Sequence, residues 1–278
     1  MNEAVVVTGA SSGIGEDVAR TLAGRGYVVY AGVRNDADAA RVATLHAGIR
    51  PVMLDVTDGA QIAAAAQTVA AGGVPLRALV NNAGVPVAGP LEYLPVEELR
   101  RQLEINVVGQ LAVTQAMLPL LRATRGRLVF IGSASGRITA PFLGPYSASK
   151  FALRALTDAL RIELGSAGIA VSLIEPGSVQ TPIWRKGRES RERLLARLSP
   201  EALERYGDAL DKLFAATVQE EKRGMPVETV TNAVVAAITA KHPRPNAILG
   251  ASAKAGNVLA MLPIRLRDRA IRASVGLR

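Results

Sequence analysis

The sequence predicts an α/β fold with one doubly wound parallel sheet and helices on both of its faces. Two observations carry this prediction. From the first residue to about residue 175, short apolar runs rich in Val and Ile alternate with longer stretches of helical period. Most of the short runs are apolar at nearly every position, which is typical of strands covered on both faces. Right-handed crossovers are expected to join successive strands.

The short apolar runs are the candidate strands. Six of them are expected at Ala4–Thr8, Val28–Val33, Arg50–Leu54, Ala78–Asn81, Arg127–Ile131 and Ala170–Ile174. A short segment near the end of the chain, Asn246–Gly250, is expected to add a last strand.

The longer periodic stretches are the candidate helices, expected near residues 14–24, 36–46, 58–71, 96–122, 146–165 and 226–240. Asp58 is placed to cap the third helix, and either Asn35 or Asp36 to cap the second. Pro226 stands at the start of the last of these helices, a position that proline favours.

The chain is expected to form a single domain over residues 1–278, because no repeat or low-complexity linker divides it. After Thr181 charged residues become frequent and strand formers rare. We therefore expect residues 183–225 to be a helical insertion that acts as a lid over the substrate site.

Residues 255–278 are expected to form a basic, amphipathic helical tail. Pro263 is expected to begin its second helix. Arginines occupy one face, at Arg265, Arg269 and Arg272, and apolar residues another, at Leu259, Leu262, Leu266, Ala270, Ala273 and Leu277. Either the apolar face docks on the body of the protein, or the tail makes a peripheral contact with a membrane surface.

Composition excludes several classes of protein. The chain has 49% hydrophobic and 21% charged residues, unlike a disordered protein, and no cysteine for a disulfide or a thiolate metal site. His46 and His242 are its only histidines. Both lie in polar, loop-like surroundings, so neither a His-based triad nor a metal site is expected.

The location and the charge of the chain are the next expectations. No basic and apolar leader opens it and no window of about 18 apolar residues could cross a bilayer, so a cytoplasmic location is expected. A net charge of +9 leaves nucleic acid, a membrane surface or an anionic ligand as its partner. Nucleic acid is not expected, because the basic tail lacks interleaved aromatic residues.

A glycine-rich turn follows the first strand. It reads Thr8-Gly9-Ala10-Ser11-Ser12-Gly13-Ile14-Gly15 and leads into a helix. Without Cβ atoms, such a turn lets backbone N–H groups and the positive helix end approach a diphosphate. An ordinary tight turn is the alternative, and the position in the first βαβ unit favours the dinucleotide site.

The turn is followed, in order, by Asn81-Asn82-Ala83-Gly84, Asn106, Ser133 and Tyr146-x-x-x-Lys150. Over residues 4 to about 182, this set resembles the short-chain dehydrogenase/reductase family. The resemblance implies a Rossmann-like sheet of about seven strands in the order 3-2-1-4-5-6-7. It also implies an NAD(P)-dependent oxidoreductase that transfers hydride between a nicotinamide cofactor and a ketone or secondary alcohol.

Tyr146 and Lys150 are expected on one face of a helix, four residues apart. A phenol of pKa about 10 is a poor acid–base catalyst at neutral pH unless its anion is stabilised, which a neighbouring ammonium can do. The resemblance makes Tyr146 the acid/base, and Lys150 also the residue that holds the nicotinamide ribose. Ser133 would hydrogen-bond the substrate oxygen, with Ser135 as the alternative. Asn106 would hold a water that relays protons toward Lys150.

The preferred cofactor is expected to be NADP(H), with NAD(H) as the alternative. The second strand ends without the acid that takes the ribose hydroxyls in NAD sites, and Arg34 follows it. Asp36 is interpreted as part of a helix cap. The expected cofactor-binding residues are Gly9, Ser11, Ser12, Gly13, Ile14, Gly15, Arg34, Asp55, Val56, Asn82, Ala83, Gly84, Tyr146, Lys150, Pro176, Gly177, Val179 and Thr181.

The substrate is expected to be a small lipophilic ketone or secondary alcohol, since the residues expected around the pocket are apolar. They are Pro86, Val87, Phe142, Leu143, Ile183 and Trp184, with Ser133, Leu143 and Tyr146 expected to contact the substrate. The chain loosely resembles the steroid- and retinoid-converting branch of the family. Relatives are commonly homodimers or homotetramers. The alternative function is a catalytically silent dinucleotide-binding sensor, against which the four retained catalytic residues argue.

Overall fold

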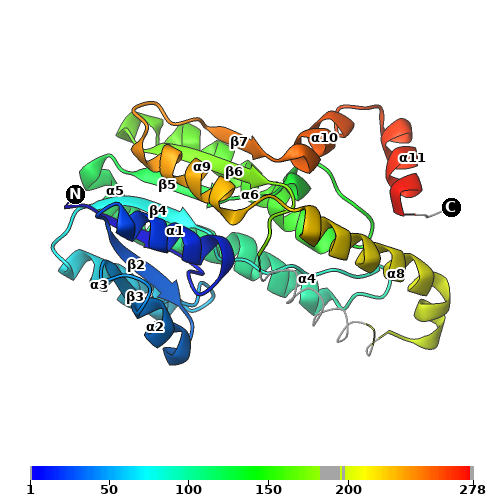
Figure 1. Cartoon of the computed structure of the whole chain (residues 1–278), viewed down its shortest axis with the longest axis horizontal. Coiled ribbons are helices and arrows are strands. Elements are labelled where there is room, and N and C mark those ends of the chain that lie inside the picture. The colour runs from blue at the N-terminus through cyan, green and yellow to red at the C-terminus, as the bar shows by residue number, and fades with distance from the viewer. Residues whose placement is uncertain (1, 182–194, 196–197, 276–278) are drawn as a thin grey trace.

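The computed structural model describes residues 2–181, 195 and 198–275. It contains a seven-stranded parallel sheet in the order β3-β2-β1-β4-β5-β6-β7 (Figure 1). The strands are β1 Ala4–Val7, β2 Val28–Val33, β3 Ile49–Met53, β4 Leu76–Asn81, β5 Arg127–Ile131, β6 Ala170–Pro176 and β7 Asn246–Leu249. The predicted fold class and strand order are confirmed.

Helices cover both faces of the sheet, and alternate strand residues point to opposite layers. Val5 and Val7 of β1 pack in the layer that contains α1, Gly13–Gly24, and α9, Val227–Thr239. Val6 packs in the opposite layer, whose helices are α3 Gly59–Ala71, α5 Gly109–Thr124 and α6 Gly144–Glu163. The central strands are thus buried on both sides, as their continuous apolar runs predict.

Local side-chain bonds explain where the second and third helices begin. Asn35 Oδ1 accepts a hydrogen bond from the Asp38 N–H at 2.8 Å, so Asn35 is the cap of α2, Asp36–Ala43, and Asp36 is its first residue. Asp58 Oδ1 accepts from the N–H groups of Ala60 and Gln61 at 2.9 and 3.1 Å and caps α3. The two caps predicted from the sequence are confirmed.

Several boundaries differ from the prediction. β4 begins at Leu76, two residues early, because Leu76 pairs with Ala4 of β1. The second helix ends at Ala43 instead of residue 46. The helix expected over 96–122 consists of α4 Val96–Leu103, a π-helical turn Glu104–Val108, and α5. The π-helical turn inserts an extra residue per turn and rotates the following side chains, which periodicity alone does not reveal.

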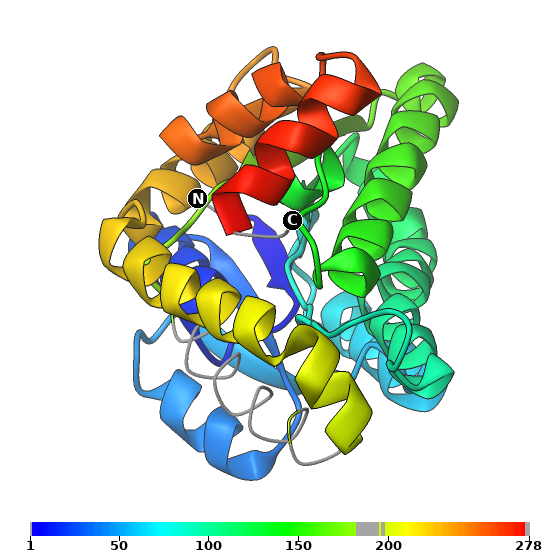
Figure 2. The same ribbon diagram turned by 90° about the vertical axis from the view of Figure 1, so that its right-hand side faces the viewer.

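Three further helices lie beyond the carboxyl ends of the strands, the end that faces the viewer in Figure 2. They are α8 Pro200–Arg223, α10 Ala251–Leu259 and α11 Ile264–Val275. α8 falls in the range expected for a lid, whereas residues 182–194 of that region lie outside the described part. In the described residues no helix is long and apolar enough to cross a bilayer.

Candidate active site

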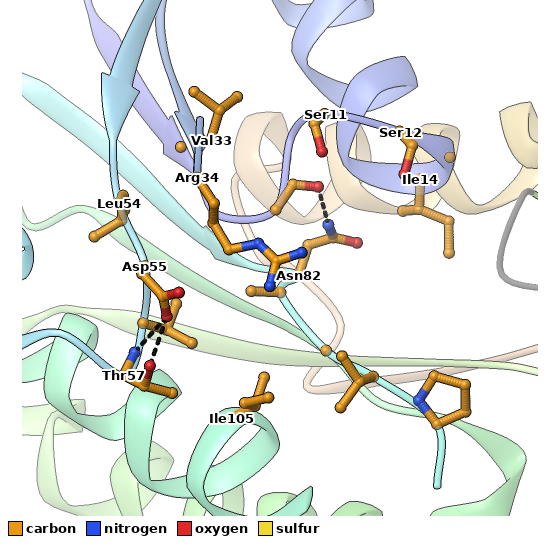
Figure 3. Close-up of a pocket in the computed structure, with 18 of the residues that line it drawn as sticks. Ser11, Ser12, Ile14, Val33, Arg34, Leu54, Asp55, Thr57, Asn82 and Ile105 are labelled. Atoms are coloured by element: carbon orange, nitrogen blue, oxygen red, sulfur yellow. Dashed lines mark hydrogen bonds between the residues drawn. The ribbon is translucent and has the colours of Figure 1, made fainter. Parts of the chain in front are cut away.

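A pocket of about 450 Å³ opens at the carboxyl ends of β1 to β4 (Figure 3). Most of the residues predicted to bind a cofactor line it: Gly9, Ser11, Ser12, Gly13, Ile14, Arg34, Asp55, Val56, Asn82, Ala83, Gly84 and Thr181. Residues that the sequence prediction missed also line it: Gly32, Val33, Leu54, Thr57, Val85, Arg101 and Ile105. The switch point of a doubly wound sheet is where such folds bind dinucleotides.

The glycine-rich turn is packed too tightly for larger residues. Gly9 and Gly13 have positive φ angles of 61° and 58°. A Cβ on Gly9 would lie 2.9 Å from the Ala83 Cα, and one on Gly15 would lie 2.3 Å from the Gly9 carbonyl oxygen. The sequence places glycine where the backbone conformation and the close contacts require it.

The turn presents the start of α1 to the pocket. Ser12 precedes the helix without capping it through its side chain. The Asn82 amide donates to the carbonyls of Thr8 and Gly9 at 2.9 and 3.0 Å, which holds the turn against the end of β4. First-turn N–H groups without a side-chain cap form an anion site, so the residues present fit the diphosphate of a dinucleotide.

Arg34 extends into the pocket between Asp55 and Asn82 (Figure 3). Among the described residues it has neither an ion-pair partner nor a hydrogen-bond partner, and Gly32 and Val33 beside it are not acids. Asp38, four residues after Arg34, accepts a hydrogen bond from the Asn35 amide at 3.0 Å. A guanidinium free to bind in this position fits a phosphate on the adenosine ribose.

Asp55 forms the opposite edge of the pocket. Its Oδ1 accepts from the N–H and the hydroxyl of Thr57 at 2.9 and 2.8 Å. These bonds fix the carboxylate at the edge of the pocket, which Ile105 also lines. An acceptor next to an apolar side chain suits the amino group and ring of an adenine.

Four buried polar side chains hold the segment that leaves β4. We call Gln102, Asn106, Gln110 and Thr114 the amide ladder, since they follow at intervals of four along α4, the π-helical turn and α5. All four are 0% exposed. Of them the sequence prediction named only Asn106. The available signal was the regular spacing of polar residues in an otherwise apolar helix.

The ladder bonds mainly to backbone. Gln102 donates to the Val85 carbonyl and accepts from the Val87 N–H, both at 2.6 Å. Asn106 accepts from the Val85 N–H at 2.9 Å and donates to the Val85 carbonyl at 3.0 Å. Gln110 donates to the Ala83 carbonyl at 2.7 Å, and Thr114 accepts from the Asn81 amide at 2.8 Å. Side chains of the helix thus fix the backbone of the pocket wall where the strand pairing ends.

Tyr146 and Lys150 lie on one face of α6, which begins at Gly144-Pro145. The Lys150 Nζ lies 5.7 Å from the centroid of the Tyr146 ring and donates to the Ile131 carbonyl at 2.8 Å. Ser133 follows β5, and its Oγ accepts from the Ser135 N–H at 3.1 Å. These three predicted catalytic residues therefore meet at the carboxyl end of β5.

Asn106 connects the ladder to this group. Its amide donates to the Ser149 hydroxyl at 3.1 Å, and that hydroxyl donates to the Tyr146 carbonyl at 2.7 Å. The side chain of Asn106 is thereby occupied by protein atoms. The water relay that the resemblance implies stays a prediction.

Burial is the main influence on the pKa values of Tyr146 and Lys150. Burial raises the pKa of Tyr146 above its usual value, and a hydrogen bond with Ser133 acts in the opposite sense. Burial lowers the pKa of Lys150 to about 8. Lys150 was expected to favour tyrosinate, but desolvation of the phenol is the largest effect on the pKa of Tyr146. Tyr146 is accordingly protonated at neutral pH.

A buried ion pair joins the segment that follows Ser133 to the end of β6. Arg137 donates to both oxygens of Glu175, at 2.9 and 2.6 Å, and to Asn257 of α10 at 2.8 Å. The side chains of Arg137 and Glu175 are 12% and 1% exposed. Arg137 lies shortly after Ser133, and Glu175 precedes Pro176. Sequence reasoning missed this pair, although an acid within the apolar run of β6 was a visible signal.

The segment after β6 is held by backbone bonds. Gly177 N–H donates to the Leu249 carbonyl at 2.9 Å, and Val179 forms a parallel bridge with Met225. Thr181 lines the pocket, whereas Pro176, Gly177 and Val179 do not. Their predicted contact with the nicotinamide is therefore not shown by this pocket.

Apolar residues cluster around Phe142, which lies in the loop that leads into α6. Phe142 has a φ of 65°, unusual for a bulky residue, and its carbonyl accepts from the Gly89 N–H at 2.8 Å. Its ring packs edge-on against Tyr206 of α8, with centroids 5.8 Å apart, and in a cluster with Leu210 and Leu213. Leu143 is half-buried beside it. Ile183 and Trp184 lie outside the described residues.

Comparison with known proteins gives one family. The family model described as short chain dehydrogenase matches residues 3–192. The chain is 38% identical over 247 residues to an NADPH-dependent 3-dehydrocapnine reductase from Ornithobacterium rhinotracheale, covering 86% of this chain and 85% of that protein. It is 36% identical over 258 residues to human (Homo sapiens) retinol dehydrogenase 16, covering 90% of this chain and 81% of that protein.

A solved structure has the same fold over almost the whole chain. It is a short chain dehydrogenase from Burkholderia cenocepacia J2315 in complex with NADP, 26% identical, with a TM-score of 0.73. The match covers 99% of this chain and 97% of that one.

Proposed function

The chain belongs to the short-chain dehydrogenase/reductase family, and from this premise we propose that it transfers hydride between NADP(H) and a lipophilic ketone or secondary alcohol. The observation that carries the proposal is the meeting of Tyr146, Lys150 and Ser133 at the carboxyl end of β5. The amide ladder links this group to the wall of the pocket through Asn106. Asn106 thus connects the helix that contains Tyr146 to the wall of the proposed dinucleotide site.

NADP(H) is proposed as the cofactor because Arg34 points into the pocket without a partner in the described structure. The bacterial relative named NADPH-dependent and the structure with NADP support this choice. The turn Gly9–Gly15 would hold the diphosphate, Asp55 and Val56 the adenine, and Asn82, Ala83 and Gly84 the adenosine wall. Tyr146 and Lys150 would hold the nicotinamide ribose, and residues 176–181 the carboxamide. When bound, the nicotinamide supplies or accepts the hydride.

Tyr146 is proposed as the acid/base. Its raised pKa keeps the phenol protonated at neutral pH, so it can give its proton to a carbonyl oxygen during reduction. Ser133, whose hydroxyl hydrogen-bonds Tyr146, would hydrogen-bond the same substrate oxygen. Lys150 is anchored on Ile131, and its ammonium would stabilise the tyrosinate that remains. Asn106 would position the proton relay toward Lys150.

A lipophilic substrate is proposed because apolar side chains surround the catalytic group. Phe142, Leu143, Pro86 and Val87 lie on the loops that adjoin it, and Leu210 and Leu213 of α8 pack against Phe142. The name of the human relative, a retinol dehydrogenase, agrees with an apolar alcohol. We propose that residues 183–225 act as a lid on this side of one domain that spans residues 1–278.

A homodimer or homotetramer is proposed through the outer faces of α5, α6 and the π-helical turn. Val108, Phe151 and Ile162 are exposed there by 49%, 43% and 80%. Large apolar side chains in such positions mark contact surfaces. No nucleic-acid partner is proposed, and the cytoplasmic location expected from the sequence stays a prediction.

The test is NADPH oxidation with a panel of cyclic, aromatic, steroidal and retinoid carbonyl compounds. Tyr146→Phe is expected to lower kcat/KM by about 10²–10⁴-fold, the usual contribution of a positioned acid, and to weaken NADPH binding much less than that, because the other cofactor contacts remain. Tyr27→Phe is the matched control, because Tyr27 is buried in the helical layer of α1 away from the site. Equal activity of Tyr146→Phe and wild type would contradict the assignment. NADPH binding without turnover of any compound would favour the dinucleotide-binding sensor.

A further inference from the structure

Large apolar side chains are exposed at the junction of α10 and α11. Within nine residues of the chain, five of them have exposed fractions between 41% and 80%. We call this set, together with three arginines, the tail surface: Val258, Met261, Leu262, Ile264, Leu266, Arg265, Arg269 and Arg272. Exposed large apolar side chains that are this close together in the chain are typical of a contact with a partner.

The tail surface is not used for packing on the body. Leu262 and Leu266 of the predicted apolar face are 41% and 56% exposed, and Ala270 and Ala273 are exposed as well. Most of this face therefore does not dock on the protein in the described residues, although Leu259 is half-buried and Leu277 lies outside them. α10 is attached instead through buried Ala253 and the hydrogen bond between Arg137 and Asn257. α11 touches α8.

The arginines of the tail surface lie on one side of α11. Arg265, Arg269 and Arg272 are four and three residues apart, a spacing that aligns side chains along a helix. All three are exposed and have no ion-pair partner in the described part of the chain. Asp268 is the only acid between residues 251 and 275, and it pairs with Arg267 at 3.4 Å. The surface is thus apolar and strongly basic at once.

We propose that the tail surface docks on an anionic lipid bilayer as a peripheral contact. The apolar side chains of residues 258–266 enter the interface, and the arginines bind lipid phosphates beside them. This charge complementarity selects lipid over a second copy of the chain. A two-fold contact of this surface with itself would bring both sets of arginines together. Nucleic acid fits poorly, because residues 251–275 contain no aromatic side chain for stacking.

The docked orientation follows from the fold. α10 comes directly after β7 and lies at the carboxyl end of the sheet, and both views place α10 and α11 at that end with α8 (Figures 1 and 2). The catalytic group lies at the carboxyl end of β5. The end of the protein that contains the active site therefore faces the bilayer.

The test is co-sedimentation of the full chain with vesicles of phosphatidylcholine alone and of phosphatidylcholine mixed with phosphatidylglycerol. Two variants alter the tail surface: Arg265→Gln/Arg269→Gln/Arg272→Gln, and Met261→Ser/Leu262→Ser/Leu266→Ser. The matched control, Arg122→Gln/Lys241→Gln/Arg244→Gln, removes the same charge from exposed positions at the amino ends of the strands. Circular dichroism and NADPH binding check that each variant folds.

Wild type and control are expected to bind the anionic vesicles and to bind the neutral ones weakly. Each tail variant is expected to lose at least about tenfold in partition coefficient. Absence of wild type from the anionic pellet overturns the proposal. So does an equal loss in the control, which would make net charge the cause. A dimer that becomes monomeric in the tail variants, with unchanged vesicle binding, would assign the surface to a second copy. No substrate takes part, so the outcome is independent of the proposed reaction.

Discussion

The ammonium of Lys150 and the ring of Tyr146 are 5.7 Å apart from Nζ to centroid, while the same ammonium is bonded to the carbonyl of Ile131 at 2.8 Å. β5 therefore fixes the position of the charge, and α6 fixes the phenol relative to it. A positive charge held near the phenol without touching it can stabilise its anion without competing for its proton. The cost is a buried ammonium, which has a measurable effect on stability.

Lys150→Met is expected to stabilise the protein at neutral pH. The pKa of Lys150 is about 8 in the folded chain against 10.5 ordinarily, so the unfolded chain binds more protons between these values and wild-type stability rises with pH there. Below pH 8 the buried charge costs about 3 kcal/mol, from 1.36 kcal/mol per pKa unit. Loss of the bond to Ile131 offsets about 1 kcal/mol of the gain.

Urea denaturation at neutral pH and at pH 10.5 measures this effect, since the gain should vanish at the upper value. Lys241→Met, at an exposed position, is the control and should show no such trend. A difference between Lys150→Met and wild type that is constant with pH would contradict the assigned pKa.

Arg34→Ala is expected to reduce the preference for NADPH. A charge-assisted bond to phosphate contributes about 1.5–3 kcal/mol, or roughly 10- to 100-fold in kcat/KM for NADPH. The value for NADH should change little, because that cofactor lacks the phosphate. Steady-state kinetics with both cofactors measure the ratio. Arg122→Ala, at an exposed position remote from the pocket, should leave it unchanged, and an unchanged ratio in Arg34→Ala would refute the role of Arg34.

Arg137→Met is expected to destabilise the protein by about 3–5 kcal/mol, because it leaves the Glu175 carboxylate buried without its partner. The double variant Arg137→Met/Glu175→Leu should regain much of this loss. Arg100→Met is the control, since its pair with Glu97 is exposed by 73% and 75% and contributes at most about 1 kcal/mol. Chemical denaturation measures all three. Similar losses for Arg137→Met and Arg100→Met would be inconsistent with a buried ion pair.

Gln102→Leu is expected to loosen the pocket wall. It removes the acceptor of the Val87 N–H and one of the two side-chain donors to the Val85 carbonyl, which keeps its bond from Asn106, a loss of about 2 kcal/mol. We expect a higher KM for cofactor, with faster hydrogen exchange of the backbone N–H groups of residues 83–85 and 87. Gln115→Leu on the exposed side of α5 is the matched control. Unchanged exchange at those amides would show that the ladder does not hold this segment.

Local patterns explain why much of the fold and the site could be predicted. The strands are continuous apolar runs, and the sequence has glycine at Gly9 and Gly13, where φ is positive, and at Gly15, where a Cβ would meet the backbone. Arg34 could be placed because it directly follows a strand. In each case the signal is a local pattern in the sequence, although the atoms that crowd Gly9 belong to the distant Ala83.

Interactions between distant residues explain what was missed. Arg137 and Glu175 are 38 residues apart, and Gln102 meets Val85 and Val87 only because α4 folds back over the end of β4. The exposure of Leu262 and Leu266 could not be foreseen either. Their helical spacing is equally compatible with docking on the body and with an outside partner.

The amide ladder fixes the backbone of the pocket wall independently of most side chains of the wall. Because helix side chains bond the backbone of residues 83–87, the course of this segment does not depend on its own side chains. Gly84 is the exception, since a Cβ there would lie 3.3 Å from the Asn106 Oδ1. Val85 and Pro86 can then be exchanged for other residues while the wall keeps its path. Both residues line the pocket assigned to the dinucleotide, so such exchanges would change the lining of that pocket without changing the course of its wall.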